Sequence, residues 1–185
     1  MDSENLPKRK HPRLGYYDYS KSGYYFVTIC TNERKPVLSI VGRGLAPAEK
    51  TINLTKTGKI AEEQLLFLEK EYPFVKIDKY VIMPNHIHII FALTEKTAGA
   101  SPRPTLSDIV CAYKSRTTRL CNKINCSPGK KMFQTSFYDE IIRNQKAYDE
   151  ISEYVYENPM KWEEDELYCS ISLQNNSINI KETQK

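Results

Sequence analysis

At 185 residues the chain is long enough for one domain with a sizeable core. No apolar run approaches the ~20 residues that a membrane span needs, which argues against a membrane-spanning protein. The net charge of +4 is modest, so its distribution matters more than its size. The N-terminus has no hydrophobic leader and the five cysteines form no Cys-x-x-Cys pair, so we expect a cytoplasmic protein with reduced thiols.

The first half of the chain predicts one strand and one helix. Aromatic and β-branched residues fill positions 23–30, a composition typical of strands. Glycines and a proline lie within residues 40–50, which we expect to form a loop. Apolar residues at helical spacing follow Thr57, a good capping residue, and Pro73 ends that helix.

The second half begins with a predicted β-hairpin. Strands over residues 74–82 and 86–93 flank the tight turn Met83-Pro84-Asn85. The elements expected after it are a helix capped by Thr105 or Ser107, a strand over residues 133–143, and a helix from the N-cap Asn144 to about Asn158.

This order of elements predicts the fold class. Strand, helix, strand, strand, helix, strand is the split βαβ order of ferredoxin-like folds. We therefore expect an α+β domain with an antiparallel sheet, helices on one face, and an added C-terminal helix. The domain would cover residues 15–162, between a flexible basic arm at 1–14 and a polar tail at 163–185.

His86 and His88 lie two apart in the strand-like run His86–Leu93. Side chains alternate along a strand, so both imidazoles should share one face, while Ile87 and Ile89 point into a core on the other. Two imidazoles on a rigid strand form half of a metal site. The alternative is a pair of histidines on a solvated strand face.

The predicted third helix could bring a nucleophile to these histidines. Tyr154 and Asn158 are four apart and share a helix face. If that face covers the histidine strand, a hydroxyl and an amide oxygen meet two imidazoles, a set that suits Mg²⁺ or Mn²⁺ acting on a phosphate. Spacing alone leaves Tyr148 and Tyr156 as rival nucleophiles.

Basic residues gather in two places, which suggests a polyanionic partner rather than only a solvated surface. The candidates for DNA contact are Lys8, Arg9, Lys10 and Arg13 in the arm, and Lys114, Arg116 and Arg119 on the second helix.

Several motifs together resemble a known family. They are Tyr25-Phe26-Val27-Thr28, Val81-Ile82-Met83-Pro84-Asn85-His86-Ile87-His88, Phe133-Gln134, Phe137-Tyr138-Asp139-Glu140-Ile141-Ile142-Arg143-Asn144 and Tyr154-x-x-x-Asn158-Pro159. Over roughly residues 8–162 the chain resembles the one-tyrosine HUH transposases, specifically the REP-associated tyrosine transposases. The family often has Trp-Gln where this chain has Phe133-Gln134, a conservative change.

The resemblance implies a ferredoxin-like enzyme that cuts and rejoins single-stranded or hairpin DNA during transposition, as a monomer or homodimer. It assigns His86 and His88 as ligands of a divalent metal, Mg²⁺ or Mn²⁺, and Tyr154 as the nucleophile that forms a 5′-phosphotyrosine. The residue one helix turn later completes the metal site in related enzymes. That residue is Asn158 here, a weaker ligand than a carboxylate.

Two other functions remain open. One is a domesticated nucleic-acid-binding protein that no longer cuts. The other is a small metallohydrolase that uses His86 and His88 with water as the nucleophile, in which case a Tyr154→Phe variant would keep its activity.

Overall fold

The computed structural model describes residues 17–43, 50–95 and 104–168. The arm predicted over residues 1–14 and most of the predicted tail, residues 169–185, lie outside these ranges. None of the helices described has the length and apolar character that a bilayer span requires. Within the same ranges, Cys30, Cys111, Cys121 and Cys126 carry free thiols.

A four-stranded sheet forms the centre of the domain. Its strands are β1 (Gly23–Cys30), β4 (Val75–Ile82), β5 (His86–Leu93) and β6 (Tyr138–Ile142). They are arranged β4-β5-β1-β6, and every neighbouring pair is antiparallel. This is the predicted split βαβ arrangement, with the histidine strand and the first strand in the middle.

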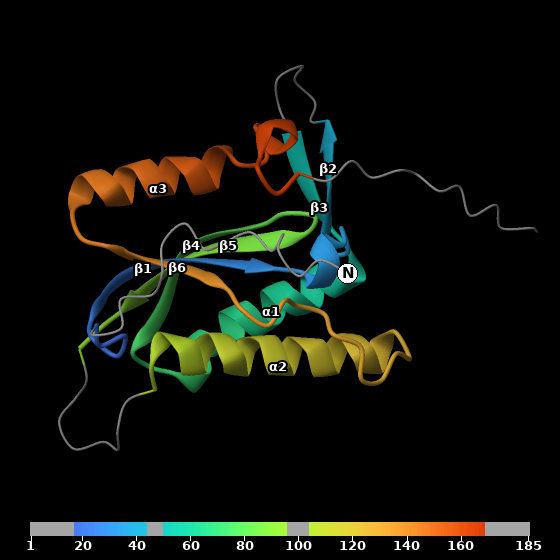
Figure 1. Cartoon of the computed structure of the whole chain (residues 1–185), viewed down its shortest axis with the longest axis horizontal. Coiled ribbons are helices and arrows are strands. Elements are labelled where there is room, and N and C mark those ends of the chain that lie inside the picture. Colours follow the sequence, from blue (N-terminus) through green and yellow to red (C-terminus); the bar gives the residue numbers. More distant parts are fainter. Residues whose placement is uncertain (1–16, 44–49, 96–103, 169–185) are drawn as a thin grey trace, which may run out of the picture.

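The helices cover the two faces of the sheet unequally (Figure 1). Helices α1 (Lys56–Glu71) and α2 (Leu106–Ile124) lie side by side on one face, and α3 (Gln145–Glu157) lies on the other. Ile87 and Ile89 are fully buried in the larger core under α1 and α2, as the strand alternation predicted. The face toward α3 has a smaller apolar cluster, so the histidines lie between this cluster and the helix.

A tight turn connects β4 to β5 and places His86 at the start of its strand. The Met83 backbone N–H donates to the His86 carbonyl oxygen at 2.9 Å. The carbonyl oxygens of Pro84 and Asn85 accept from the backbone N–H groups of Leu38 and Thr31, at 3.0 and 2.9 Å. These bonds hold the turn against the end of β1 and the residue before β2.

Three local predictions differ from the structure. Within the segment expected to be a loop over residues 40–50, the described residues belong instead to two paired strands, β2 (Ser39–Arg43) and β3 (Lys50–Leu54), while residues 44–49 lie outside the described ranges. The pairing partners stabilise each other across the hairpin, and neither short strand has a clear pattern alone. Thr55, not Thr57, caps α1, because its Oγ1 accepts from the Gly58 N–H at 3.0 Å.

Strand β6 is shorter than the strand predicted over residues 133–143, because a bulge precedes it. Thr28 pairs with Tyr138, so the same register would place residue 135 opposite Thr31. Thr31 instead forms an isolated bridge with Phe133. Two extra residues are therefore accommodated between Phe133 and Tyr138, and this bulged segment leaves the ladder and lines the cavities described below.

Gly58 offers a test of how α1 packs on the hairpin. A Cβ at Gly58 would collide with the backbone carbonyl oxygen of Leu38, which cannot rotate away. Gly58→Ala should therefore lower the free energy of unfolding by about 1–3 kcal/mol, although alanine is the better helix former. Urea unfolding measures the change, and Lys59→Ala, at the exposed neighbouring position, is the control. A Gly58→Ala protein as stable as the parent would contradict this packing.

Candidate active site

The two histidines are buried, which contradicts the solvated-face alternative. The side chains of His86 and His88 are 0% and 2% exposed, and their ring centroids lie 4.4 Å apart. His88 stacks on Phe26 at 5.3 Å, and His86 lies 5.8 Å from the Trp162 ring. Both imidazoles therefore face the same enclosed space between the sheet and α3.

Asn85 fixes the tautomer of His86. The amide of Asn85 donates through Nδ2 to the Leu167 carbonyl oxygen at 2.7 Å, so its Oδ1 faces Nδ1 of His86 at 2.8 Å. An amide oxygen only accepts, so Nδ1 of His86 carries the proton and Nε2 presents a lone pair. That Nε2 is buried and has no hydrogen-bond partner among the described residues. Burial lowers the pKa of His86 to about 4, although the Asp165 carboxylate opposes the shift, so the ring is neutral at pH 7.

His88 bridges the sheet and the helix. Its Nδ1 lies 2.8 Å from Oγ1 of Thr28, the residue opposite it on β1. Its Nε2 lies 3.2 Å from Oη of Tyr154 on α3. Burial, with a smaller contribution from His86, holds the pKa of His88 well below its usual value. A neutral imidazole in this position can bind a cation or accept a proton.

Tyr154 extends from α3 into this space. Its ring meets Phe26 edge-on at 6.1 Å, and its Oη also lies 3.4 Å from Oδ2 of Asp165. Burial raises the pKa of Tyr154 above its ordinary value, and the Asp165 carboxylate raises it further. The phenol therefore keeps its proton at neutral pH and needs added positive charge nearby to act as a nucleophile.

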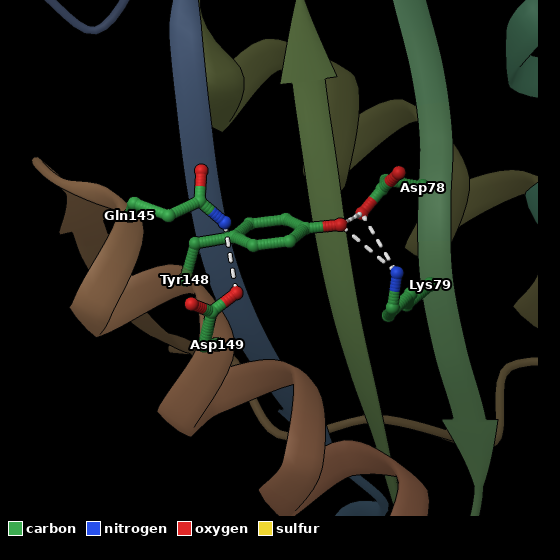
Figure 2. Close-up of polar contacts among 5 residues, drawn as sticks. All are labelled: Asp78, Lys79, Gln145, Tyr148 and Asp149. Carbon is green, nitrogen blue, oxygen red and sulfur yellow. Dashed lines mark hydrogen bonds and ion pairs between the residues drawn. The ribbon is translucent and has the colours of Figure 1, made fainter.

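The rival tyrosines lie elsewhere on α3. Tyr148 points to β4, where its hydroxyl donates to Asp78 at 2.7 Å and accepts from Lys79 at 2.9 Å (Figure 2). Tyr156 is 78% exposed. Of these three candidates, Tyr154 is the one that contacts a histidine of the pair.

Asn158 and Asp165 complete the polar cluster. Asn158, at the C-terminal end of α3, is 3% exposed, and its Nδ2 donates to Oδ2 of Asp165 at 2.7 Å. Its Oδ1 is buried without a partner among the described residues. Ligand atoms of His86, His88 and Asp165 all lie within 4.8 Å of one another. The structure thus brings together the four predicted residues and adds Asp165.

Sequence reasoning missed Asp165, Asn85 and Thr28 as members of the site. Asp165 follows three other acidic or aromatic positions, Trp162 to Glu164, and nothing in that run distinguishes it from its neighbours. Asn85 had a detectable signal, since an amide next to a candidate ligand histidine can orient its ring. The importance of Thr28 depends on strand register, which the sequence does not specify.

The cluster opens into a cavity of about 1130 Å³ between α3 and the sheet. Its described lining carries many carboxylates and one lysine, Lys161. The acidic side chains include Glu140, Glu150, Glu153, Glu157, Asp165 and Glu166. Such a lining repels a polyanion unless cations accompany it.

The predicted DNA-binding residues of α2, Lys114, Arg116 and Arg119, do not line this cavity. Helix α2 lies on the opposite face of the sheet from α3 (Figure 1). Arg116 is paired with Glu71 at 2.6 Å, whereas Lys114 donates to the Thr135 carbonyl oxygen at 2.9 Å. The predicted contacts in the arm, Lys8, Arg9, Lys10 and Arg13, lie outside the described residues.

A second cavity, of about 790 Å³, lies between α2 and the segment that follows it; we call it the basic groove. None of the described residues that line it is acidic. Its basic residues are Lys114, Arg119, Lys123, Lys130 and Lys131. Gln134, in the bulge before β6, lines both the groove and the acidic cavity, so the two are neighbours.

Comparison with known families shows which family the chain belongs to. The family model described as "Transposase IS200 like" matches residues 55–158, more than half of the chain. The chain belongs to the IS200-like transposase family. The matched residues contain the histidine pair, Tyr154 and Asn158, and end before Asp165.

Individual relatives agree with this assignment. A Haemophilus influenzae protein, described only as uncharacterized, is 30% identical over 86% of this chain and 93% of its own length. The REP-associated tyrosine transposase of Escherichia coli K12 is 26% identical over 77% of this chain and 70% of its own length. The predicted membership of the transposase family is therefore confirmed, and this relative belongs to the REP-associated branch that the sequence resembled.

A solved structure supports the fold. The structure of a REP-associated tyrosine transposase bound to a REP hairpin aligns with a TM-score of 0.57 at 22% identity. The alignment covers 83% of this chain and 74% of the other. This transposase thus shares the fold of that protein.

The burial of His88 predicts a stability cost for its removal. Because the ring packs between Phe26 and Tyr154, His88→Ala should lower the free energy of unfolding by about 1–3 kcal/mol, measured by urea unfolding in EDTA. Tyr156→Ala removes a larger ring from a position that is 78% exposed and should change stability by less than about 0.5 kcal/mol. Equal costs for the two variants would contradict the buried placement of His88.

Proposed function

We propose that this transposase cuts and rejoins single-stranded DNA through a covalent bond between Tyr154 and a 5′-phosphate. The observation that carries the proposal is the placement of Oη of Tyr154 at 3.2 Å from Nε2 of His88, beside a second buried imidazole with an unpartnered lone pair. A phenol, two neutral imidazoles and a carboxylate in one cluster suit metal-assisted phosphoryl transfer better than acid–base hydrolysis.

The reaction balances without an external energy source. Oη of Tyr154 attacks the phosphorus of a phosphodiester and forms an O–P bond, while the bond from phosphorus to the 3′ oxygen breaks. The phenol proton is transferred overall to the departing 3′ oxygen. The products are a 5′-phosphotyrosine and a free 3′-hydroxyl, and attack by another 3′-hydroxyl reverses the step and joins the strands.

The residues present fit a divalent cation, Mg²⁺ or Mn²⁺. Nε2 of His86 and Oδ1 of Asn158 are buried and have no hydrogen-bond partners within the described part of the chain, and the tautomer of His86 leaves its lone pair directed into the site. When bound, such an ion supplies positive charge that stabilises the phosphate and the forming phenolate. His86 and His88 would hold it, while Thr28 and Asn85 orient the two rings.

The charge distribution supports a path for the DNA outside the catalytic cavity. Carboxylates dominate the lining of that cavity, so its side chains contribute little to binding a phosphate backbone. The basic groove is lined by lysines and an arginine and adjoins the cavity at Gln134. A single strand held in the groove would pass Gln134 into the site. The relative solved with a REP hairpin supports hairpin DNA as the substrate class.

Tyr154 should form a covalent bond with DNA. Cleavage of a hairpin oligonucleotide labelled on the 3′ side of the cut, with Mn²⁺ present, should leave label on the protein after boiling in detergent. Tyr154→Phe should abolish the labelled band, because no other hydroxyl is placed against His88 among the described residues of α3.

Tyr156→Phe is the matched control, since it removes a hydroxyl two residues away that is exposed. It should keep the labelled band, and peptide mapping should place the label on the segment that contains Tyr154. Cleavage with no protein-bound DNA would favour water as the nucleophile, as in the metallohydrolase alternative. Absence of both cleavage and label in the unaltered protein would favour a binding protein that no longer cuts.

The basic groove should account for much of the salt dependence of binding. Replacing Lys123, Lys130 and Lys131 by glutamine should weaken binding to single-stranded DNA. The slope of log K against log salt should become shallower by about 2, at ~0.7 for each lost phosphate contact. Fluorescence anisotropy at several salt concentrations gives this slope.

The control replaces Lys56, Lys70 and Lys146, three exposed lysines outside the groove, and so changes the net charge equally. Arg116→Gln should also leave the slope unchanged, because Arg116 is already paired with Glu71. Equal slopes for the groove and control variants would show that the DNA binds elsewhere.

A further inference from the structure

The carboxylate of Asp165 lies beside the histidine pair although it comes from beyond α3 and beyond the residues that the family model matches. We propose that Asp165 is the anionic ligand of the cation site, and that Asn158 is a positioning residue that aims this carboxylate at the cation. This inference rests on the proposed function. It differs from the family expectation, which gives the third position to the helix residue one turn after the tyrosine.

Nε2 of His86 carries a lone pair directed into the site. Because Nδ1 donates to Asn85, Nε2 can only accept or ligate, and it is buried with no hydrogen-bond partner among the described residues. Proteins rarely leave such an atom unsatisfied. Nε2 faces the same space as Nε2 of His88 and the Asp165 carboxylate, whose ligand atoms lie within 4.8 Å of one another. Ligands on one octahedral Mg²⁺ lie up to ~4.2 Å apart, so small side-chain movements suffice.

The site needs an anionic ligand if it binds a hard divalent cation. Two neutral imidazoles and the neutral amide of Asn158 offer no negative charge to a hard divalent cation. Mg²⁺ and Mn²⁺ favour carboxylate oxygen ligands. Asp165 supplies that charge, and the Nδ2 group of Asn158 donates to its Oδ2 at 2.7 Å. This bond orients the carboxylate while Oδ1 of Asn158 stays available to the site.

Neighbouring residues hold the Asp165 carboxylate in place. The Leu167 N–H donates to Oδ1 of Asp165 at 2.6 Å, and the Leu167 carbonyl accepts from Asn85 at 2.7 Å. Trp162, 5% exposed, packs beside His86 at the start of the same short segment. The side-chain amide of Asn85 therefore contacts both the His86 ring and the backbone close to Asp165. These contacts fix the position of the Asp165 carboxylate beside the histidine pair.

Asp165 could instead accept the proton of Tyr154, because its Oδ2 lies 3.4 Å from the phenol oxygen. The two roles differ in what Asp165→Asn does to cation binding. A ligand is needed for binding even without DNA, whereas a proton acceptor is not. The decisive measurement is therefore cation affinity in the absence of substrate.

Isothermal titration calorimetry with Mn²⁺ on the full chain, freed of metal beforehand, tests the proposal. Asp165→Asn is nearly isosteric and should weaken Mn²⁺ binding at least tenfold. Glu166→Gln removes the same charge one residue away and should change affinity less than twofold. Asn158→Ala should weaken binding less than Asp165→Asn does. Melting curves in EDTA and in Mn²⁺ report folding, and Asp165→Asn should fold in EDTA but lose most of the Mn²⁺-induced rise in Tm.

The outcomes separate this inference from the proposed function. Unchanged Mn²⁺ affinity in Asp165→Asn, with tight binding by the parent protein, would overturn the ligand role of Asp165 and leave the proposed function standing. An equal loss in Glu166→Gln would overturn it as well, since the effect would then be general electrostatics. If neither the parent protein nor His86→Ala binds Mn²⁺, both the ligand role of Asp165 and the proposed metal-assisted function would be overturned.

Discussion

The antiparallel pairing of β1 with β5 is the interaction on which the site depends. It sets Thr28 opposite His88 and Cys30 opposite His86, with both histidines facing α3. A slip of one residue would turn both imidazoles into the core under α1 and α2 and bring Ile87 and Ile89 to the site. The register is held by burial, because those isoleucines are 0% exposed on the far face. The hydrophobic core therefore determines where the polar cluster forms.

The sequence predicted the elements whose signals are local. The histidine strand occupies His86–Leu93 as predicted, and Asn144 caps α3, because alternation and capping act within a few residues. It did not predict the β2–β3 hairpin or the bulge before β6, which depend on partners far along the chain. Within the site, the histidine pair and Tyr154 were recognisable. Asp165 was not, because the turn that returns it to the histidines is made by packing of Trp162 rather than by a sequence motif.

The two neighbouring cavities have linings of opposite charge. The cavity at the proposed active site is acidic and suits a cation, whereas the basic groove suits a phosphate backbone, and Gln134 borders both. Charge density along α2 suggests DNA contacts at Lys114, Arg116 and Arg119 alike. The structure separates them, because Lys114 and Arg119 line the groove whereas Arg116 pairs with Glu71. In the proposed mechanism, this separation confines phosphate binding to the groove and lets the scissile phosphate approach the acidic site together with its cation.

Helix α3, which carries the proposed nucleophile Tyr154, has few buried side chains with which to hold its position on the sheet. Val155 is its one buried side chain among the described residues, and Ala147, Tyr148 and Ile151 are only partly buried against the same apolar cluster. Polar contacts act at two further points. Near its N-terminus, Tyr148 is held by Asp78 and Lys79 on β4, and at its C-terminus Asn158 is held by Asp165. If Asp165 binds the cation, the C-terminal contact and the cation site stabilise each other. Binding of the cation would then also fix the end of the helix from which Tyr154 approaches the phosphate.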